Sequence, residues 1–203
     1  MTRRRIKSGL MRLTALILLG VYGVAGWRVL HPAPSPEYAV YYLKGELHRW
    51  PGQDGLKYQM GANLDFSKPL VNLSRQGWSE PEGWGGTWSD GPVGSVFLSL
   101  SQRPKAGLNL TLTGHAFVNA QHPLQRVEVL VNGTIIGSLR YDDPLSNTRT
   151  LSIPGSVLQR VEHGILTVTL RFPDACAPVA LGLSGDTRKL GLGVASMRLT
   201  PSI

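Results

Sequence analysis

Short segments in which apolar and polar residues alternate fill the second half of the chain, and they limit its fold more than any other feature. The alternation is clearest at Leu108–Thr113 and at Gly164–Phe172. Successive side chains of a strand point to opposite faces of a sheet, so a period of two predicts strands with one buried face. Five further segments have the same character: Val96–Leu100, Arg126–Val131, Thr134–Leu139, Thr148–Ile153 and Val194–Thr200.

The turns between these segments support the same fold class. Asn132-Gly133 separates two of the segments and predicts a tight hairpin, because both central residues of a type I′ turn need positive φ. Turn signals recur at intervals of about 8–12 residues, which is typical of sandwiches and barrels. One helical turn is expected between Pro154 and Val161. We therefore predict an all-β domain, an antiparallel β-sandwich or jelly roll.

The first 30 residues have a different composition. Basic residues crowd positions 1–12, and Leu13–Trp27 carries no charge. As a helix, residues 10–30 rise about 31 Å, enough to cross a hydrocarbon core of roughly 30 Å. The basic cluster comes before this segment, so it stays cytoplasmic and the rest of the chain crosses. We predict a single-pass signal-anchor helix in a bacterial inner membrane, with the β domain in the periplasm.

A cleaved signal peptide is the alternative for this segment. Val24-Ala25-Gly26 is a tolerable small-residue cleavage pattern, and secretion would then follow cleavage. The bulky Trp27 after the site and the apolar Val29-Leu30 beyond it favour the anchor. Both alternatives export the rest of the chain.

Composition divides the chain into three parts. Residues 1–30 are predicted as the cytoplasmic tail and signal-anchor helix, and residues 74–203 as the β-sandwich domain. Between them, residues 31–73 form a spacer and lead-in segment that begins with the proline-rich run HPAPSP, which favours an extended chain.

The net charge of +8 does not indicate a nucleic-acid-binding protein. Six of the 21 Lys and Arg residues lie at or before Arg28, whereas all 13 Asp and Glu residues follow it, so 15 basic residues face 13 acidic ones in the rest of the chain. A nucleic-acid-binding domain is expected to carry its basic excess on the folded part. We therefore expect no nucleic-acid partner.

No pattern in the sequence indicates a cofactor or a metal. The five histidines lack the spacing of metal ligands, and no phosphate-binding glycine loop or nucleophile elbow occurs. Cys176, the one cysteine, has the apolar neighbours Ala175, Ala177 and Pro178, so it is predicted to be a small buried side chain.

The segment GWSEPEGWGGTWSDG, residues 77–91, is the candidate site. It holds Trp78, Trp84 and Trp88, three of the five tryptophans, among five glycines. The apolar face of a sugar ring stacks on an indole, and nearby carboxylates can accept hydrogen bonds from its hydroxyls. Six residues are therefore predicted to bind a ligand: Trp78, Glu82, Trp84, Trp88, Asp90 and Arg188.

A structural role for part of this segment is the competing interpretation. A sandwich of this size needs large core residues, and we expect at least one of the three tryptophans, Trp88 beside the first clear strand, to lie in the core. In the later segment LSGDTR, Asp186 and Arg188 are predicted to form a structural turn. A pairing of Arg188 with Asp90 across the two segments is the alternative.

Two motifs together carry a family resemblance. GWSEPEGWGGTWSDG and the later PVALGLSGDTRKLGLGVASMRL resemble a bacterial domain of jelly-roll character that occurs with membrane-bound phosphoglycerol transferases and glycosyltransferases of envelope glycans. The match runs from Ser74 to Leu199. The residues that match the motifs are Trp84, Trp88, Ser89, Asp90, Leu183, Ser184, Asp186, Arg188, Leu190 and Gly191. This chain carries no transferase region, so the resemblance implies an accessory module.

These observations lead to one functional hypothesis and two rivals. The leading hypothesis is a membrane-anchored, non-catalytic periplasmic module of the cell envelope that binds or organises a glycan or its biosynthesis machinery. A glycan-modifying enzyme is the first rival, with Glu82 and Asp90 as acid and base about 5–10 Å apart. The second is a structural partner subunit of a membrane glycosyltransferase, with the tryptophan segment as its interface.

Overall fold

The computed structural model describes residues 2–32, 55–69, 75–100, 106–145, 147–159 and 164–202. The chain separates into two compact units, Met1–Ser35 and Pro36–Ile203. Of the predicted spacer and lead-in segment, residues 31–73, the parts 33–54 and 70–73 lie outside the described residues.

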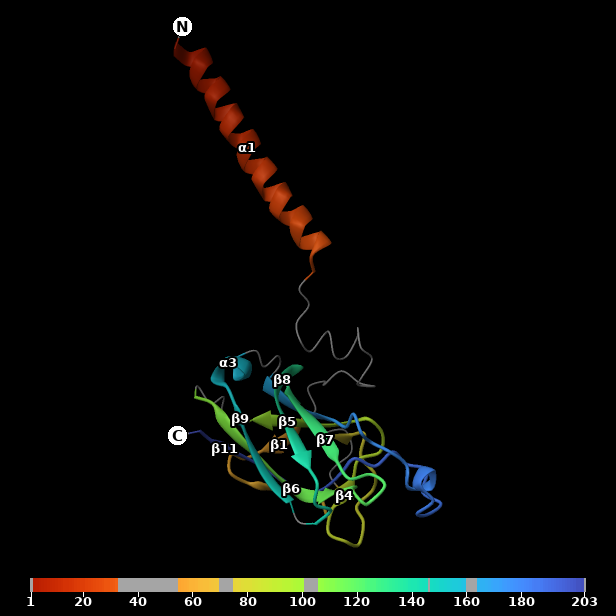
Figure 1. Cartoon of the computed structure of the whole chain (residues 1–203). Coiled ribbons are helices and arrows are strands. Elements are labelled where there is room, and N and C mark those ends of the chain that lie inside the picture. The colour runs from red at the N-terminus through yellow and green to blue at the C-terminus, as the bar shows by residue number, and fades with distance from the viewer. Residues whose placement is uncertain are drawn as a thin grey trace. The chain divides into compact units, whose positions relative to one another are not determined.

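The first unit contains one long helix, α1 (Thr2–Leu30), drawn in red in Figure 1. Its stretch Met11–Leu30 has a mean hydropathy of 1.7 and is long and apolar enough to cross a membrane. A membrane anchor and a signal sequence share this property. The apolar helix predicted from the sequence is confirmed.

The second unit contains two β-sheets. The first sheet has the strand order β1-β5-β10-β7-β8, with β3 paired to β5. The second sheet has the order β2-β11-β6-β9, with β4 paired to β11. The first consists of β1 (Leu56–Tyr58), β3 (Arg75–Gln76), β5 (Val93–Leu100), β7 (Gln125–Val131), β8 (Thr134–Tyr141) and β10 (Ile165–Arg171). The second consists of β2 (Asn63–Asp65), β4 (Thr87–Trp88), β6 (Leu108–Ala116), β9 (Asn147–Ile153) and β11 (Leu192–Pro201).

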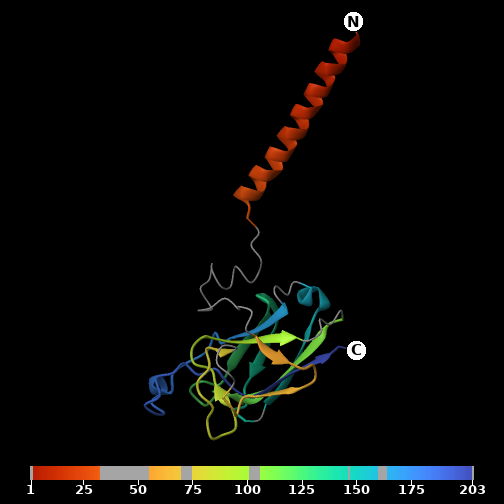
Figure 2. The same ribbon diagram turned by 180° about the vertical axis from the view of Figure 1, so that it is seen from behind.

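The β-sandwich predicted from the sequence is confirmed. The pairings are antiparallel except for β1 and β5, which run parallel. The sheets also include β1 and β2, whose residues were assigned to the lead-in segment, so they take in strands that precede Ser74. Two short helical pieces are described as well, α3 (Gly155–Leu158), within the predicted helical turn, and η3 (Pro178–Leu181). η3, drawn in blue, projects from the strands in both views (Figure 1 and Figure 2).

One hydrophobic core lies between the two sheets. Along β6, buried and half-buried residues alternate without interruption, because every second side chain points inward. Leu110 and Leu112 of β6 and Leu98 and Leu166 of the first sheet are at most 1% exposed. The inward rows of both sheets belong to the same cluster of buried side chains.

The predicted hairpin between β7 and β8 is confirmed. Asn132 and Gly133 have φ values of 48° and 73°, the positive values that this turn requires. The side chain of Asn132 adds a contact that sequence reasoning did not anticipate, because its Oδ1 accepts a hydrogen bond from the backbone N–H of Thr167 at 2.9 Å. The turn is thereby attached to β10.

Candidate functional site

Residues 77–91 form an irregular hairpin. Its base is closed by an antiparallel bridge between Trp78 and Ser89, and its tip by a second bridge between Glu82 and Gly86. The tip turn is held by two hydrogen bonds, from the N–H of Glu82 to the carbonyl of Gly86 at 2.8 Å and from the N–H of Gly85 to the carbonyl of Glu82 at 3.1 Å. Gly85 has a φ of 94°, which explains a glycine at this position.

Trp78, at the base of the hairpin, is half-buried and packs against the hydrophobic core. Its ring packs edge-on against Phe66 and Phe172, and its indole N–H donates a hydrogen bond to the carbonyl of Ser95 at 3.1 Å. We expected at least one of the three tryptophans to lie in the core and named Trp88; Trp78 takes this place, and Trp88 does not. Trp88 is the outward residue of β4, whereas its neighbour Thr87 is fully buried.

Trp84, at the tip, lies over a notch left by two glycines. A Cβ atom at Gly86 would come within 2.2 Å of the Trp84 ring, and one at Gly193 within 2.9 Å. The ring also stacks on His115, with centroids 4.8 Å apart and planes inclined by 26°. The hairpin therefore folds back onto the outer face of the second sheet, because His115 is an outward residue of β6 and Gly193 is its partner on β11.

Five half-buried rings form a continuous row on this face. Trp84 contacts Trp88 at 5.6 Å with an interplanar angle of 55°, and Trp88 meets the edge of Phe117 at 6.3 Å. Phe117 stacks on His122 at 6.1 Å. We call this set the aromatic row; its members in spatial order are His115, Trp84, Trp88, Phe117 and His122.

Two of the five members of the aromatic row were predicted from the sequence. Trp84 and Trp88 were predicted, whereas His115, Phe117 and His122 were not included in the site. A signal for His115 existed in the sequence, because it continues the outward positions Thr111 and Thr113 of an alternating strand. That the tip of a distant hairpin would lie beside it depends on the tertiary fold.

Arg188 joins the hairpin to the loop between η3 and β11. Its Nη1 donates hydrogen bonds to Oε1 of Glu82 and to Oγ of Ser79, both at 2.7 Å. Its Nη2 donates to Oδ2 of Asp186 at 2.6 Å, and Nε donates to the same carboxylate at 3.1 Å. Arg188 thereby links the two motifs that carried the family resemblance.

The electrostatics of this cluster follow from the ion pairs. Hydrogen bonds from Arg188 hold the pKa of Asp186 below its ordinary value of 3.8. In return, the hydrogen bond to Asp186 raises the pKa of Arg188, and the hydrogen bond to Glu82 raises it further by a smaller amount. The predicted Asp186–Arg188 turn is present in the structure, and the backbone N–H of Arg188 also donates to Oδ1 of Asp186 at 2.9 Å.

The carboxylate partner of Arg188 on the hairpin is Glu82, not Asp90. Glu82 is engaged in the ion pair at 2.7 Å, whereas Asp90 is exposed at the end of the hairpin. The described contacts therefore do not bring Glu82 and Asp90 together as an acid and base pair. Among the described residues, no three His, Cys, Asp or Glu side chains are grouped as metal ligands would be.

Ser89 makes a second link between the two motifs. It is fully buried, and its Oγ accepts hydrogen bonds from the backbone N–H groups of Gly191 at 2.8 Å and Leu192 at 3.3 Å. Thr87 acts similarly on the other side, donating its hydroxyl hydrogen to the carbonyl of Phe66 at 2.9 Å. Ser89 and Thr87 thus have a structural role.

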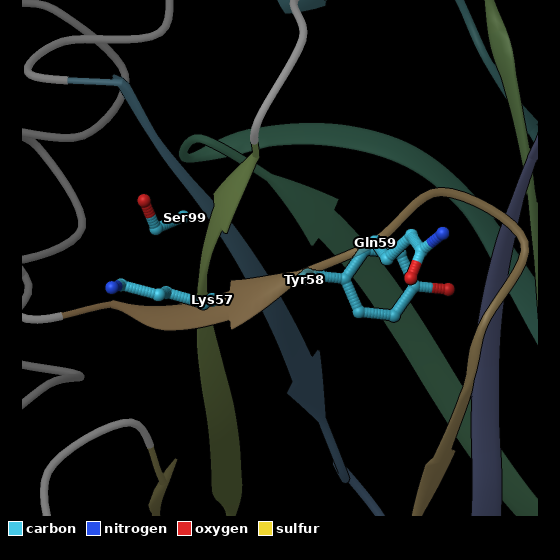
Figure 3. Close-up of a pocket in the computed structure, with 4 residues that line it drawn as sticks. All are labelled: Lys57, Tyr58, Gln59 and Ser99. Atoms are coloured by element: carbon cyan, nitrogen blue, oxygen red, sulfur yellow. The ribbon is translucent and has the colours of Figure 1, made fainter.

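Two further features lie outside the hairpin. Cys176 was predicted to be buried and is only half-buried, and the burial that it has raises the pKa of its thiol. A hollow of about 570 Å³ is lined by Lys57, Tyr58, Gln59 and Ser99. Figure 3 shows Lys57 and Ser99 directed to one side, with the ring of Tyr58 on the other. The Tyr58 hydroxyl accepts a hydrogen bond from the N–H of Leu199 at 2.8 Å, a contact that links β1 to β11.

No family model matches this sequence. No curated protein matches it either. Among solved structures, the chain is similar to the CBM36-1 domain of a multidomain xylanase from the hindgut metagenome of Trinervitermes trinervoides, with 12% identity, a TM-score of 0.45, and coverage of 70% of this chain and 98% of that one. It is also similar to a CBM36 carbohydrate-binding module solved with calcium and xylotriose, with 12% identity and a TM-score of 0.40. That match covers 68% of this chain and 99% of that one.

A third structure gives a similar result. CsCBM6-3 from Clostridium stercorarium, solved with cellobiose, is 12% identical with a TM-score of 0.39, and the match covers 73% of this chain and 98% of that chain. Values this low carry no argument about the ligand or the site of the present chain.

Proposed function

We propose that this chain is a membrane-anchored accessory module that binds glycan through the aromatic row on the outer face of its second sheet. The observation that carries the proposal is the row itself, five contiguous rings that are half-buried on a sheet face. A cluster of aromatic side chains that remains partly open to solvent usually marks a binding surface.

The chemistry of the row suits sugars. The apolar faces of sugar rings pack on aromatic side chains, and polar groups beside the rings can bind the hydroxyls. His115 and His122, at the two ends of the row, each carry ring nitrogens that donate or accept hydrogen bonds. The planes of Trp84 and Trp88 are inclined by 55°, so the row offers rings in several orientations to a single chain and does not form one flat plane.

Hydroxyl groups continue the surface beyond His115. On the same outward positions of β6, Thr113 pairs with Thr148 at 3.1 Å and Thr111 pairs with Thr150 at 3.0 Å, with the oxygens of each pair within hydrogen-bond distance. These four side chains present donors and acceptors to solvent on β6 and β9. A glycan that extends past His115 along β6 would meet them.

The cellular context is part of the proposal. The apolar helix Met11–Leu30 supports anchoring in a membrane, and the basic residues before it favour a cytoplasmic N-terminus and a periplasmic domain. The motif resemblance described above suggests envelope glycan as the ligand and a membrane-bound transferase as the partner. Both remain predictions.

A titration of the full-length chain in detergent would test glycan binding. Periplasmic glucans and lipopolysaccharide-derived oligosaccharides are added, and binding is followed by calorimetry and tryptophan fluorescence. We expect saturable binding that weakens at least tenfold in Trp88→Ala, equivalent to about 1.4 kcal/mol. Ile135→Ala removes an exposed apolar side chain from β8, outside the row, and is expected to bind like the parent. A folded parent that binds none of these glycans, or unchanged affinity in Trp88→Ala, would reject the proposal.

A further inference from the structure

The tip of the hairpin carries Trp84. Trp84 lies between Glu82 and Gly86, and these two residues are bridged to each other. Glu82 provides the N–H and the carbonyl that close the turn, so the position of Glu82 sets the position of Trp84 two residues later. Any contact that fixes the Glu82 side chain therefore bears on the aromatic row.

Arg188 supplies this contact from outside the hairpin. Its guanidinium is planar and presents several donors in a fixed arrangement. Asp186 engages Nε and Nη2, which leaves Nη1 directed at Glu82 and Ser79. A lysine in this place would offer one ammonium group and would not span both carboxylates with the same geometry.

The pair of Arg188 and Glu82 is partly shielded from water. Their side chains are 32% and 35% exposed, and the N–O distance is 2.7 Å. Asp90 of the hairpin is placed differently, because it is exposed and lies beyond the bridge at the hairpin base. The structure thus offers a close pair at the tip and an exposed carboxylate at the base of the same segment.

We propose that Arg188 is a positioning residue that, through Glu82, holds the hairpin tip so that Trp84 lies in the aromatic row. As far as it concerns ligand binding, this inference rests on the proposed function. Arg188 was predicted from the sequence to contact the ligand directly. Here it acts at a distance, through the turn that carries the tryptophan.

The experiment measures the position of Trp84 without any ligand. Two indoles 5.6 Å apart give an exciton-coupled circular-dichroism signal, which depends on the mutual orientation of their planes. Trp84→Phe in the full-length chain identifies the part of the signal that belongs to the pair with Trp88. Arg188→Lys, Glu82→Ala and the double variant are then compared with the parent, and Asp90→Ala is the matched control.

We expect Arg188→Lys and Glu82→Ala each to lose at least half of the pair signal. The double variant should lose no more than the single ones, because both act through one contact. Glu82→Gln keeps an acceptor for Nη1 and should retain most of the signal, and Asp90→Ala should retain all of it. Thermal unfolding should occur at nearly the parent temperature in each variant, since the core is untouched.

Glycan affinity measured on the same variants separates the two proposals. Loss of the pair signal in Arg188→Lys and Glu82→Ala, together with tenfold weaker binding, supports both. Loss of the signal when the parent binds no glycan supports the positioning role and rejects the proposed function. An intact pair signal in these variants would overturn the positioning role, whether or not binding is lost.

Discussion

The outer faces of the two sheets look alike in the sequence and differ in the structure. The segments LNLTLT of β6 and ILTVTL of β10 both alternate aliphatic residues with polar ones. In β6, Thr111 and Thr113 are partly open to solvent. In β10, the corresponding Thr167 and Thr169 are each only 1% exposed. The same pattern thus forms a surface in one sheet and an interior in the other.

The first sheet buries an additional apolar cluster on its outer face. Phe97, Leu130 and Ile165, from three adjacent strands, are at most 4% exposed and pack together apart from the main core. Beside them the hydroxyls of Ser95 and Thr169 lie 3.0 Å apart, so these buried polar groups are paired. The comparison indicates that the first sheet is covered on both faces around β5, β10 and β7, whereas the second sheet keeps one face open to solvent.

The largest difference in stability between the two faces is expected when a large side chain is removed from the covered face of the first sheet. Leu130→Ala should destabilise the domain by about 3 kcal/mol, because it removes buried methyl groups and leaves a cavity. Thr150→Ala, on the open face, should cost less than about 0.5 kcal/mol. Urea unfolding of the two full-length variants, followed by tryptophan fluorescence, measures both. Similar costs for the two would show that the faces do not differ as described.

An intermediate effect is expected where the hairpin rests on the open face. Gly86→Ala places a Cβ atom 2.2 Å from the Trp84 ring and 2.5 Å from the carbonyl oxygen of Val194. We expect overpacking to lower the free energy of unfolding by about 2 kcal/mol. Trp84 should be displaced, and the tryptophan emission should change. Gly185→Ala is the control, because its Cβ would point into open space. Parent-like stability and emission in Gly86→Ala would contradict the described seating of Trp84.

The smallest effect on stability is expected when a single threonine hydroxyl is removed from one face or the other. Thr169→Val leaves the hydroxyl of Ser95 without its partner in a buried place and should cost about 1 kcal/mol. Thr113→Val breaks an equivalent pair with Thr148 on the open face, where water replaces the lost partner, and should leave stability nearly unchanged. Equal urea midpoints for both variants would remove the distinction between buried and open threonine pairs.

Much of the fold was predictable because it depends on local pattern. Alternation located the longer strands, and the need for positive φ located the hairpin at Asn132-Gly133. The short strands β3 and β4 were missed, since two residues are too few for a period to be seen. The coverage of β10 on both faces was also not predictable, because alternation does not reveal what packs on the polar side.

The candidate site was predictable only in part for a related reason. The density of tryptophans pointed to the right segment, but the sequence did not show which of them faces the core. Trp78 does so because its bridge to Ser89 turns the indole toward Phe66 and Phe172. Likewise, Arg188 and Glu82 are 106 positions apart, and their pairing follows from the fold and not from spacing.

The place of β11 in the second sheet has a consequence for how the domain is made. β11 follows all the other strands in the described chain, yet it lies inside the sheet and pairs with β2, β4 and β6. Strands that pair across such long sequence separations form late and slowly. During synthesis, β2 and β4 must therefore wait for residues 192–201 before this sheet can close. A chain interrupted before that point would leave strand edges exposed, and such edges are templates for aggregation.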